Sequence, residues 1–128
     1  MDPTTFIVLL SVNLVCSGGL FFLISRHMPM GSGVAEWSAG MILFGAAFLG
    51  RLLTGLGAEQ PGAVIVDSAM ILGALLYLAG LRQWLGLAPW RRSWLPVLTL
   101  AYAVTHLLAL SNWGVAGRFM LLNLSLAA

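Results

Sequence analysis

The sequence predicts an all-α fold, a polytopic bundle of membrane-spanning helices, and three observations support this prediction. Of the 128 residues, 60% are hydrophobic and only 8% are charged. The mean hydropathy is +0.98. Several apolar runs reach about 20 residues, which is long enough to cross a bilayer. A soluble domain of this size could not bury so much apolar surface.

We expect four full transmembrane helices and the start of a fifth, in one transmembrane domain that covers residues 1–128. The predicted helices occupy residues 5–25, 37–56, 63–81, 94–112 and 118–128. The first run follows no basic segment and precedes no A-x-A site, so it does not resemble a cleaved signal peptide. The last run has about eleven residues, too few to cross a bilayer. It is either a re-entrant or tilted segment or the start of a helix in a chain that continues beyond Ala128, and we expect continuation.

The first predicted helix contains a short polar stripe. Asn13 and Ser17 lie one helical turn apart, and we expect them to face protein rather than lipid. Cys16 is the single cysteine, which excludes a disulfide framework and predicts a small packing residue.

The second and third predicted helices each carry one charge within apolar sequence. Arg51 precedes Leu56 by five residues, and Asp67 follows Gly62 by five. At about 1.5 Å per residue, both lie roughly 8 Å below the same membrane surface. Because a charge in hydrocarbon costs about 3 kcal/mol, such residues tend to pair. The spacing predicts an Arg51–Asp67 ion pair, either structural or lining a ligand pocket that opens to the outside.

Small residues accompany both charges. Gly40 and Ala47 lie on the expected face of Arg51, by steps of three and four, Ala74 lies on the face of Asp67, and Ala69 and Gly73 are a further small pair four residues apart. Small residues allow helices to approach closely, within one chain or between chains. We expect helix–helix association with a second copy or with another membrane protein.

Basic residues predict the orientation. Four arginines lie on one side of the predicted helices: Arg26, Arg82, Arg91 and Arg92. The opposite side carries Asp2 and Glu59 instead. By the positive-inside rule the N-terminus lies outside, and the Trp-rich linker that follows Arg82 lies at the cytoplasmic surface. Because the arginines flank or enter apolar runs, the net charge of +2 does not indicate nucleic-acid binding.

The fourth predicted helix has a polar face that includes Tyr102 and His106. His106 and Arg118 lie at similar depths on either side of Asn112, so all three side chains are candidates for the interior. His106 is interpreted as a hydrogen-bonded packing residue or as a ligand-binding residue. The only other histidine, His27, lies on the opposite side, which excludes a bis-histidine haem within one chain. We expect no cofactor.

The sequence contains none of the motifs typical of soluble enzymes. It has no phosphate-binding glycine loop, no HExxH and no GxSxG. We therefore expect no catalytic residue and no metal site. A small proton-coupled multidrug exporter is disfavoured because Asn13 stands where its first helix needs an acid.

The chain begins MDP, its first helix ends in an arginine, and two long segments follow, EWSAGMILFGAAFLGRLL and VIVDSAMILGALLYLAGLRQWLG. These features resemble the N-terminal multi-span membrane region of bacterial GGDEF proteins, the membrane-bound diguanylate cyclases. The resemblance covers nearly the whole chain and consists of apolar helices with arginines at their ends.

The resemblance implies a sensory or anchoring module in the bacterial inner membrane, with a periplasmic N-terminus and an unidentified ligand. Its signal would be a displacement of the last helix. The chain has no GG[DE]EF loop, so it is not expected to make cyclic di-GMP itself. The alternative is a small structural subunit of a respiratory or photosynthetic membrane complex, which the Trp-rich linker and small-residue faces suit equally.

Overall fold

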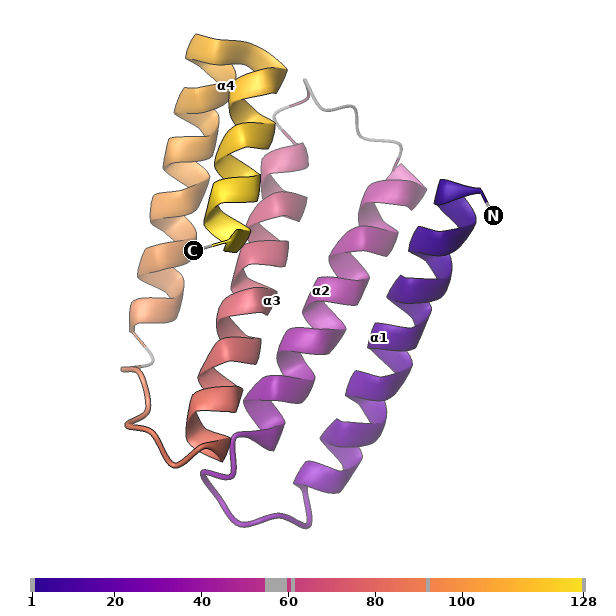
Figure 1. Ribbon diagram of the computed structural model, residues 1–128, viewed down its shortest axis with the longest axis vertical. Helices are drawn as coiled ribbons and strands as arrows, with labels where there is room; N and C mark the ends of the chain where they lie inside the picture. Colours follow the sequence, from indigo (N-terminus) through magenta and orange to yellow (C-terminus); the bar gives the residue numbers. More distant parts are fainter. Residues whose placement is uncertain (1, 55–59, 61, 92, 128) are drawn as a thin grey trace.

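The computed structural model describes residues 2–54, 60, 62–91 and 93–127. They form four helices: α1 (Pro3–Ser25), α2 (Val34–Thr54), α3 (Ala63–Trp84) and α4 (Trp94–Ala127) (Figure 1). No strand occurs within these residues. All four helices are long and apolar enough to cross a membrane. The predicted all-α membrane fold is therefore confirmed.

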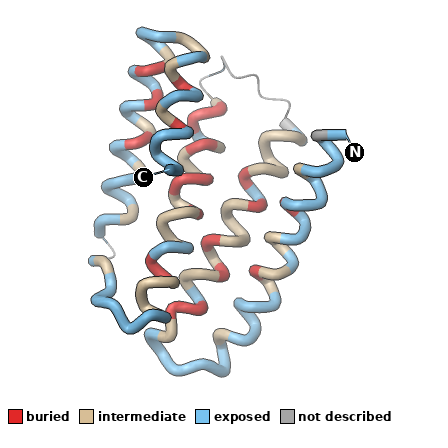
Figure 2. Tube along the Cα trace, in the orientation of Figure 1, coloured by how far each residue is buried: buried red, intermediate tan, exposed pale blue. Residues whose placement is uncertain are grey.

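The helices lie side by side in chain order, each antiparallel to the one before it (Figure 1). In the described part of the chain, α2 packs against α1 and α3, and α4 packs against α3. Buried residues accordingly concentrate on α3 and on the faces turned toward it, whereas α1 is largely exposed (Figure 2). In a bilayer, the exposed apolar faces of α1 and α4 contact lipid or a partner helix.

The ends of the helices differ slightly from the predicted ones. α2 begins at Val34 rather than at residue 37, and α3 extends to Trp84 rather than to 81. α3 ends where Gly86 adopts a φ of 70° and Leu87 N–H donates to the carbonyl of Arg82. A glycine in this left-handed conformation is a common helix terminator. The predicted end of the second helix, at 56, lies outside the described residues.

α4 reverses its direction at a single residue, Gly114, which has a φ of 64° and a ψ of −155°. Residues 94–113 run along α3, and residues 115–127 then return beside it (Figure 1). The sequence predicts a link over 112–117 between two helical runs, and the reversal lies within it, but the link is shorter than predicted, because helix continues up to and directly after Gly114. This backbone region is populated almost exclusively by glycine.

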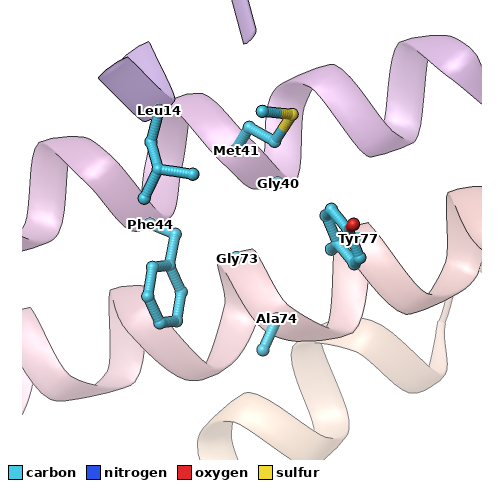
Figure 3. A pocket seen from close by; sticks show the side chains of 7 residues that line it. All are labelled: Leu14, Gly40, Met41, Phe44, Gly73, Ala74 and Tyr77. Atoms are coloured by element: carbon cyan, nitrogen blue, oxygen red, sulfur yellow. The ribbon is translucent and has the colours of Figure 1, made fainter. Parts of the chain in front are cut away.

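α2 and α3 approach each other backbone to backbone at Gly40 and Gly73. A Cβ atom at Gly40 would lie 2.6 Å from the carbonyl oxygen of Gly73 and 2.6 Å from the backbone nitrogen of Tyr77. An apolar cavity of about 330 Å³ lies beside this crossing, with Leu14, Phe44 and Tyr77 among its lining residues (Figure 3). The close approach requires residues without a side chain.

Replacement of Gly40 by alanine is expected to destabilise the protein by about 1–3 kcal/mol, because the new methyl group meets backbone atoms that cannot rotate away. Gly19→Ala is the matched control, since a Cβ atom there meets nothing within 4 Å. Alanine is also the better helix former, by about 1 kcal/mol. Thermal denaturation in detergent checks both variants. Equal midpoints for the two alanine variants would contradict the backbone contact.

The polar stripe predicted on α1 does not pack against α2 in the described part of the chain. Asn13 is exposed and Ser17 is half-buried, with Ser17 Oγ 3.5 Å from Asn13 Oδ1. Cys16 is exposed as well. The face that packs against α2 carries Ser11 and Gly18 instead, both buried. The spacing of Asn13 and Ser17 places them on one face, but the small residues of α1 and α2 decide which face packs.

Candidate functional site

A cluster of charged side chains surrounds Asp67, in the second turn of α3. The carboxylate is fully buried. Arg51, from the last turn of α2, donates from Nη1 to Asp67 Oδ1 at 2.5 Å. The ion pair predicted from the sequence is therefore present, and it joins two consecutive antiparallel helices.

A second arginine, Arg118 of α4, binds the other carboxylate oxygen. Its Nε and Nη2 atoms lie 3.0 Å and 2.6 Å from Asp67 Oδ2. Both of these donors go to Oδ2, whereas Arg51 binds Oδ1. The Arg118 side chain is fully buried, and its guanidinium lies 5.6 Å from the ring centre of Phe119. Asp67 therefore holds α2, α3 and the returning part of α4 together.

His106 and Tyr102 complete the cluster from the first part of α4. The two side chains are buried, and His106 Nδ1 lies 2.9 Å from the Tyr102 hydroxyl. His106 Nε2 lies 3.6 Å from Asp67 Oδ2, beyond hydrogen-bond distance, and has no hydrogen-bond partner among the described residues. If the Tyr102 hydroxyl donates to Nδ1, the ring proton is on Nε2, on the side of the carboxylate.

The sequence predicted three members of this cluster, Tyr102, His106 and Arg118, as polar interior candidates and paired Arg51 alone with Asp67. The structure shows that Arg118 makes the more buried contact. The sequence placed Arg118 at the depth of His106, after a link over 112–117, but did not assign it to Asp67. Asn13 and Ser17 lie outside the cluster, on α1, which packs against α2 alone in the described part of the chain.

The cluster carries two guanidinium groups and one carboxylate among the described residues. Burial of such charges is costly, and mutual attraction offsets the cost only when geometry and hydrogen bonding are good. Here both carboxylate oxygens accept hydrogen bonds from guanidinium N–H groups. Among the described residues, the cluster therefore carries more positive than negative charge.

Arg51 is the cluster member that remains accessible. Its side chain is 23% exposed, whereas those of Asp67, His106 and Arg118 are fully buried. Arg51 lines a cavity of about 660 Å³ together with Phe48 and Leu52 of α2 and Phe119 of α4. The charge cluster is thus connected to the exterior through Arg51.

At the opposite end of the bundle, the linker between α3 and α4 carries basic and aromatic residues in contact. Arg82 Nη2 donates to the carbonyl of Ala88 at 3.2 Å, and its guanidinium lies 5.5 Å from the Trp90 ring centre. Such pairs are typical of a segment at a membrane surface. Arg92 and Glu59, two of the residues used to predict the orientation, lie outside the described residues.

The geometry is suited to anion binding at Arg51 and to coupling α2, α3 and α4 through Asp67. Among the described residues, no group of three or more His, Cys, Asp and Glu side chains is placed to hold a metal ion. No protein-family model matches the sequence, and no characterised protein or solved structure is detectably similar to it.

Proposed function

We propose that this chain is a membrane-embedded sensory or anchoring module of the kind that precedes the catalytic domain of bacterial membrane-bound diguanylate cyclases. The observation that supports this function is the Arg118–Asp67 ion pair. It ties residues 115–127, the last helical segment, to α3 through one buried carboxylate. A signal passed along the last helix would have to move this contact.

In this proposal, the ion pairs around Asp67 have alternative arrangements. Arg51 and Arg118 share Asp67, so a ligand that draws Arg51 away changes the electrostatic environment of Arg118. A ligand shifts such an equilibrium only by binding the two arrangements with different affinities. In this proposal the arrangement of residues 115–127 against α3 is the output.

The conservative variant Arg118→Lys tests the sensory function in the protein encoded by the complete reading frame. Lysine keeps the charge but lacks the fork of N–H donors that holds Asp67 Oδ2. We expect cyclic di-GMP levels in cells to change at least about threefold, which corresponds to less than 1 kcal/mol of coupling, at unchanged abundance in the membrane. Ser125→Ala, at an exposed position of the same segment, is the control.

A reading frame that continues past residue 128 into a GGDEF domain is required by this function. A frame that stops there would contradict it and favour the alternative, a structural subunit of a larger membrane complex. The exposed apolar faces of α1 and α4 are compatible with that alternative, which predicts that the chain co-purifies with a respiratory or photosynthetic complex.

The proposed location is the bacterial inner membrane, with the N-terminus in the periplasm. Alkaline phosphatase, which is active only in the periplasm, tests it. A fusion after Gln60, between α2 and α3, is expected to be active, and a fusion after Ala88, between α3 and α4, to be inactive. The reverse pattern would invert the topology and place the charge cluster toward the cytoplasm.

A further inference from the structure

The cavity beside Arg51 has walls from four helices and is largely apolar. Its lining comprises Ile7 of α1, Phe48 and Leu52 of α2, Met70 of α3, and residues of the returning part of α4. Its volume, about 660 Å³, lies within the usual range of small-molecule sites, about 300–1,000 Å³. Phe119 and Leu126, on the α4 side, are 41% and 42% exposed, so the cavity opens at the surface of the bundle.

Arg51 gives this apolar cavity a cationic end. A guanidinium has five N–H donors, and among the described residues Arg51 uses Nη1 for Asp67. The other oxygen of Asp67 accepts from Arg118, so the carboxylate does not compensate both arginines. An occupant that suits the cavity therefore has an anionic group next to an apolar chain.

The position of Arg51 along α2 specifies the occupant further. Arg51 lies three residues before Thr54, the end of α2, which is roughly 5 Å along a helix. The guanidinium is therefore within reach of the headgroup layer of the bilayer, where phosphodiesters lie. Asn123 also lines the cavity and adds a polar amide.

We propose that this cavity is a binding site for an anionic phospholipid. The phosphodiester is bound by Arg51, and one acyl chain lies along Phe48, Met70 and Leu122. Charge complementarity favours this occupant over a zwitterionic lipid, and the apolar wall favours it over free phosphate. The site rests on the contacts of Arg51 and does not depend on the sensory function.

Native mass spectrometry of the full chain in detergent tests the site with two lipids of identical acyl chains, phosphatidylglycerol and phosphatidylcholine. We expect the chain to bind phosphatidylglycerol about tenfold more tightly, because phosphatidylcholine has the same phosphodiester but adds a quaternary ammonium group that is repelled by the positive charge of Arg51. Oleate and inorganic phosphate are the other probes, and both are expected to bind more weakly than phosphatidylglycerol.

Two variants locate the binding. Arg51→Gln is expected to abolish the tenfold preference, and Leu126→Trp is expected to lower phosphatidylglycerol affinity by filling the cavity without touching the charge cluster. Met120→Trp is the matched control, because Met120 lies on the same segment, is 67% exposed and does not line the cavity. If Arg51→Gln does not fold, the site is tested by comparing the phosphatidylglycerol affinity of Leu126→Trp with that of Met120→Trp.

Equal binding of the two phospholipids by the unaltered chain would overturn the proposal. So would equal loss of phosphatidylglycerol affinity in Leu126→Trp and Met120→Trp, or a preference for oleate or inorganic phosphate. Retained phosphatidylglycerol preference in a folded Arg51→Gln variant would place the lipid elsewhere. A binding result in either direction leaves the cyclic di-GMP test of the sensory function unaffected.

Discussion

Asp67→Asn is expected to destabilise the protein by about 3–5 kcal/mol, the cost of removing one partner from a buried ion pair. Asparagine is nearly the same size, so the loss is one of charge and not of packing. It leaves the fully buried guanidinium of Arg118 and the partly exposed one of Arg51 without their carboxylate. We expect most of the folded, monodisperse protein to be lost, as measured by size-exclusion chromatography in detergent and by the unfolding midpoint.

Second-site variants then show which of the two arginines destabilises the protein more once Asp67 has lost its charge. Removal of a cation that has lost its partner should restore stability in proportion to how deeply that cation is buried. We expect Asp67→Asn with Arg118→Met to recover more folded protein than Asp67→Asn with Arg51→Met, because the Arg118 side chain is 0% exposed and that of Arg51 is 23% exposed.

Two outcomes would contradict this description of the cluster. Wild-type stability of Asp67→Asn would mean that the buried ion pairs contribute nothing. Better recovery with Arg51→Met would mean that Arg51, and not Arg118, carries the larger desolvation cost. Arg26→Gln is the control for the general loss of an arginine, because Arg26 lies at the end of α1, away from the cluster.

The Arg51–Asp67 pair was predictable because it depends on local quantities. The connection between α2 and α3 is short, so the two helices must be antiparallel neighbours, and counting residues from their ends gives the depth of each charge. The four apolar runs were equally visible, because length and hydropathy are properties of single segments. Orientation about the helix axis was predictable where a charge, a polar side chain or small residues marked one face, as for Asp67, His106 and Gly40.

Two kinds of feature were not predictable from the sequence. One is the backbone conformation of a single residue, and the other is the choice of which helix face packs. A break between residues 112 and 118 was predictable, but not that it takes a single residue, Gly114. The interior position of Arg118 was predictable as well, whereas its pairing with Asp67 was not, because that pairing depends on how residues 115–127 pack against α3. On α1, the polar pair Asn13 and Ser17 was more conspicuous than the small residues that make the contact. In a membrane, close packing and not polarity often selects the interface.

Gly114→Ala is the second substitution that we expect to destabilise the protein strongly, because Gly114 is the residue at which α4 reverses. At a φ of 64° and a ψ of −155°, a side chain costs about 1–3 kcal/mol of backbone strain. Relief of that strain by a straight helix would produce a 34-residue rod of roughly 51 Å, far longer than the hydrocarbon core of about 30 Å. Arg118 would then leave Asp67, and the cost of the broken ion pair would add to the strain.

The shared loss of the Arg118–Asp67 contact makes the effects of Gly114→Ala and Asp67→Asn non-additive. We expect the double variant to be less destabilised than the sum of the single variants, because the contact can be broken only once. The exposed neighbour Ala116→Ser, which keeps the reversal, should combine additively with Asp67→Asn. If Asp67→Asn combined additively with Gly114→Ala as well as with Ala116→Ser, residues 115–127 would keep their place without Gly114. The ion pair would then result from packing of residues such as Leu122 against Ile71 and Tyr102, and not from the conformation of one glycine.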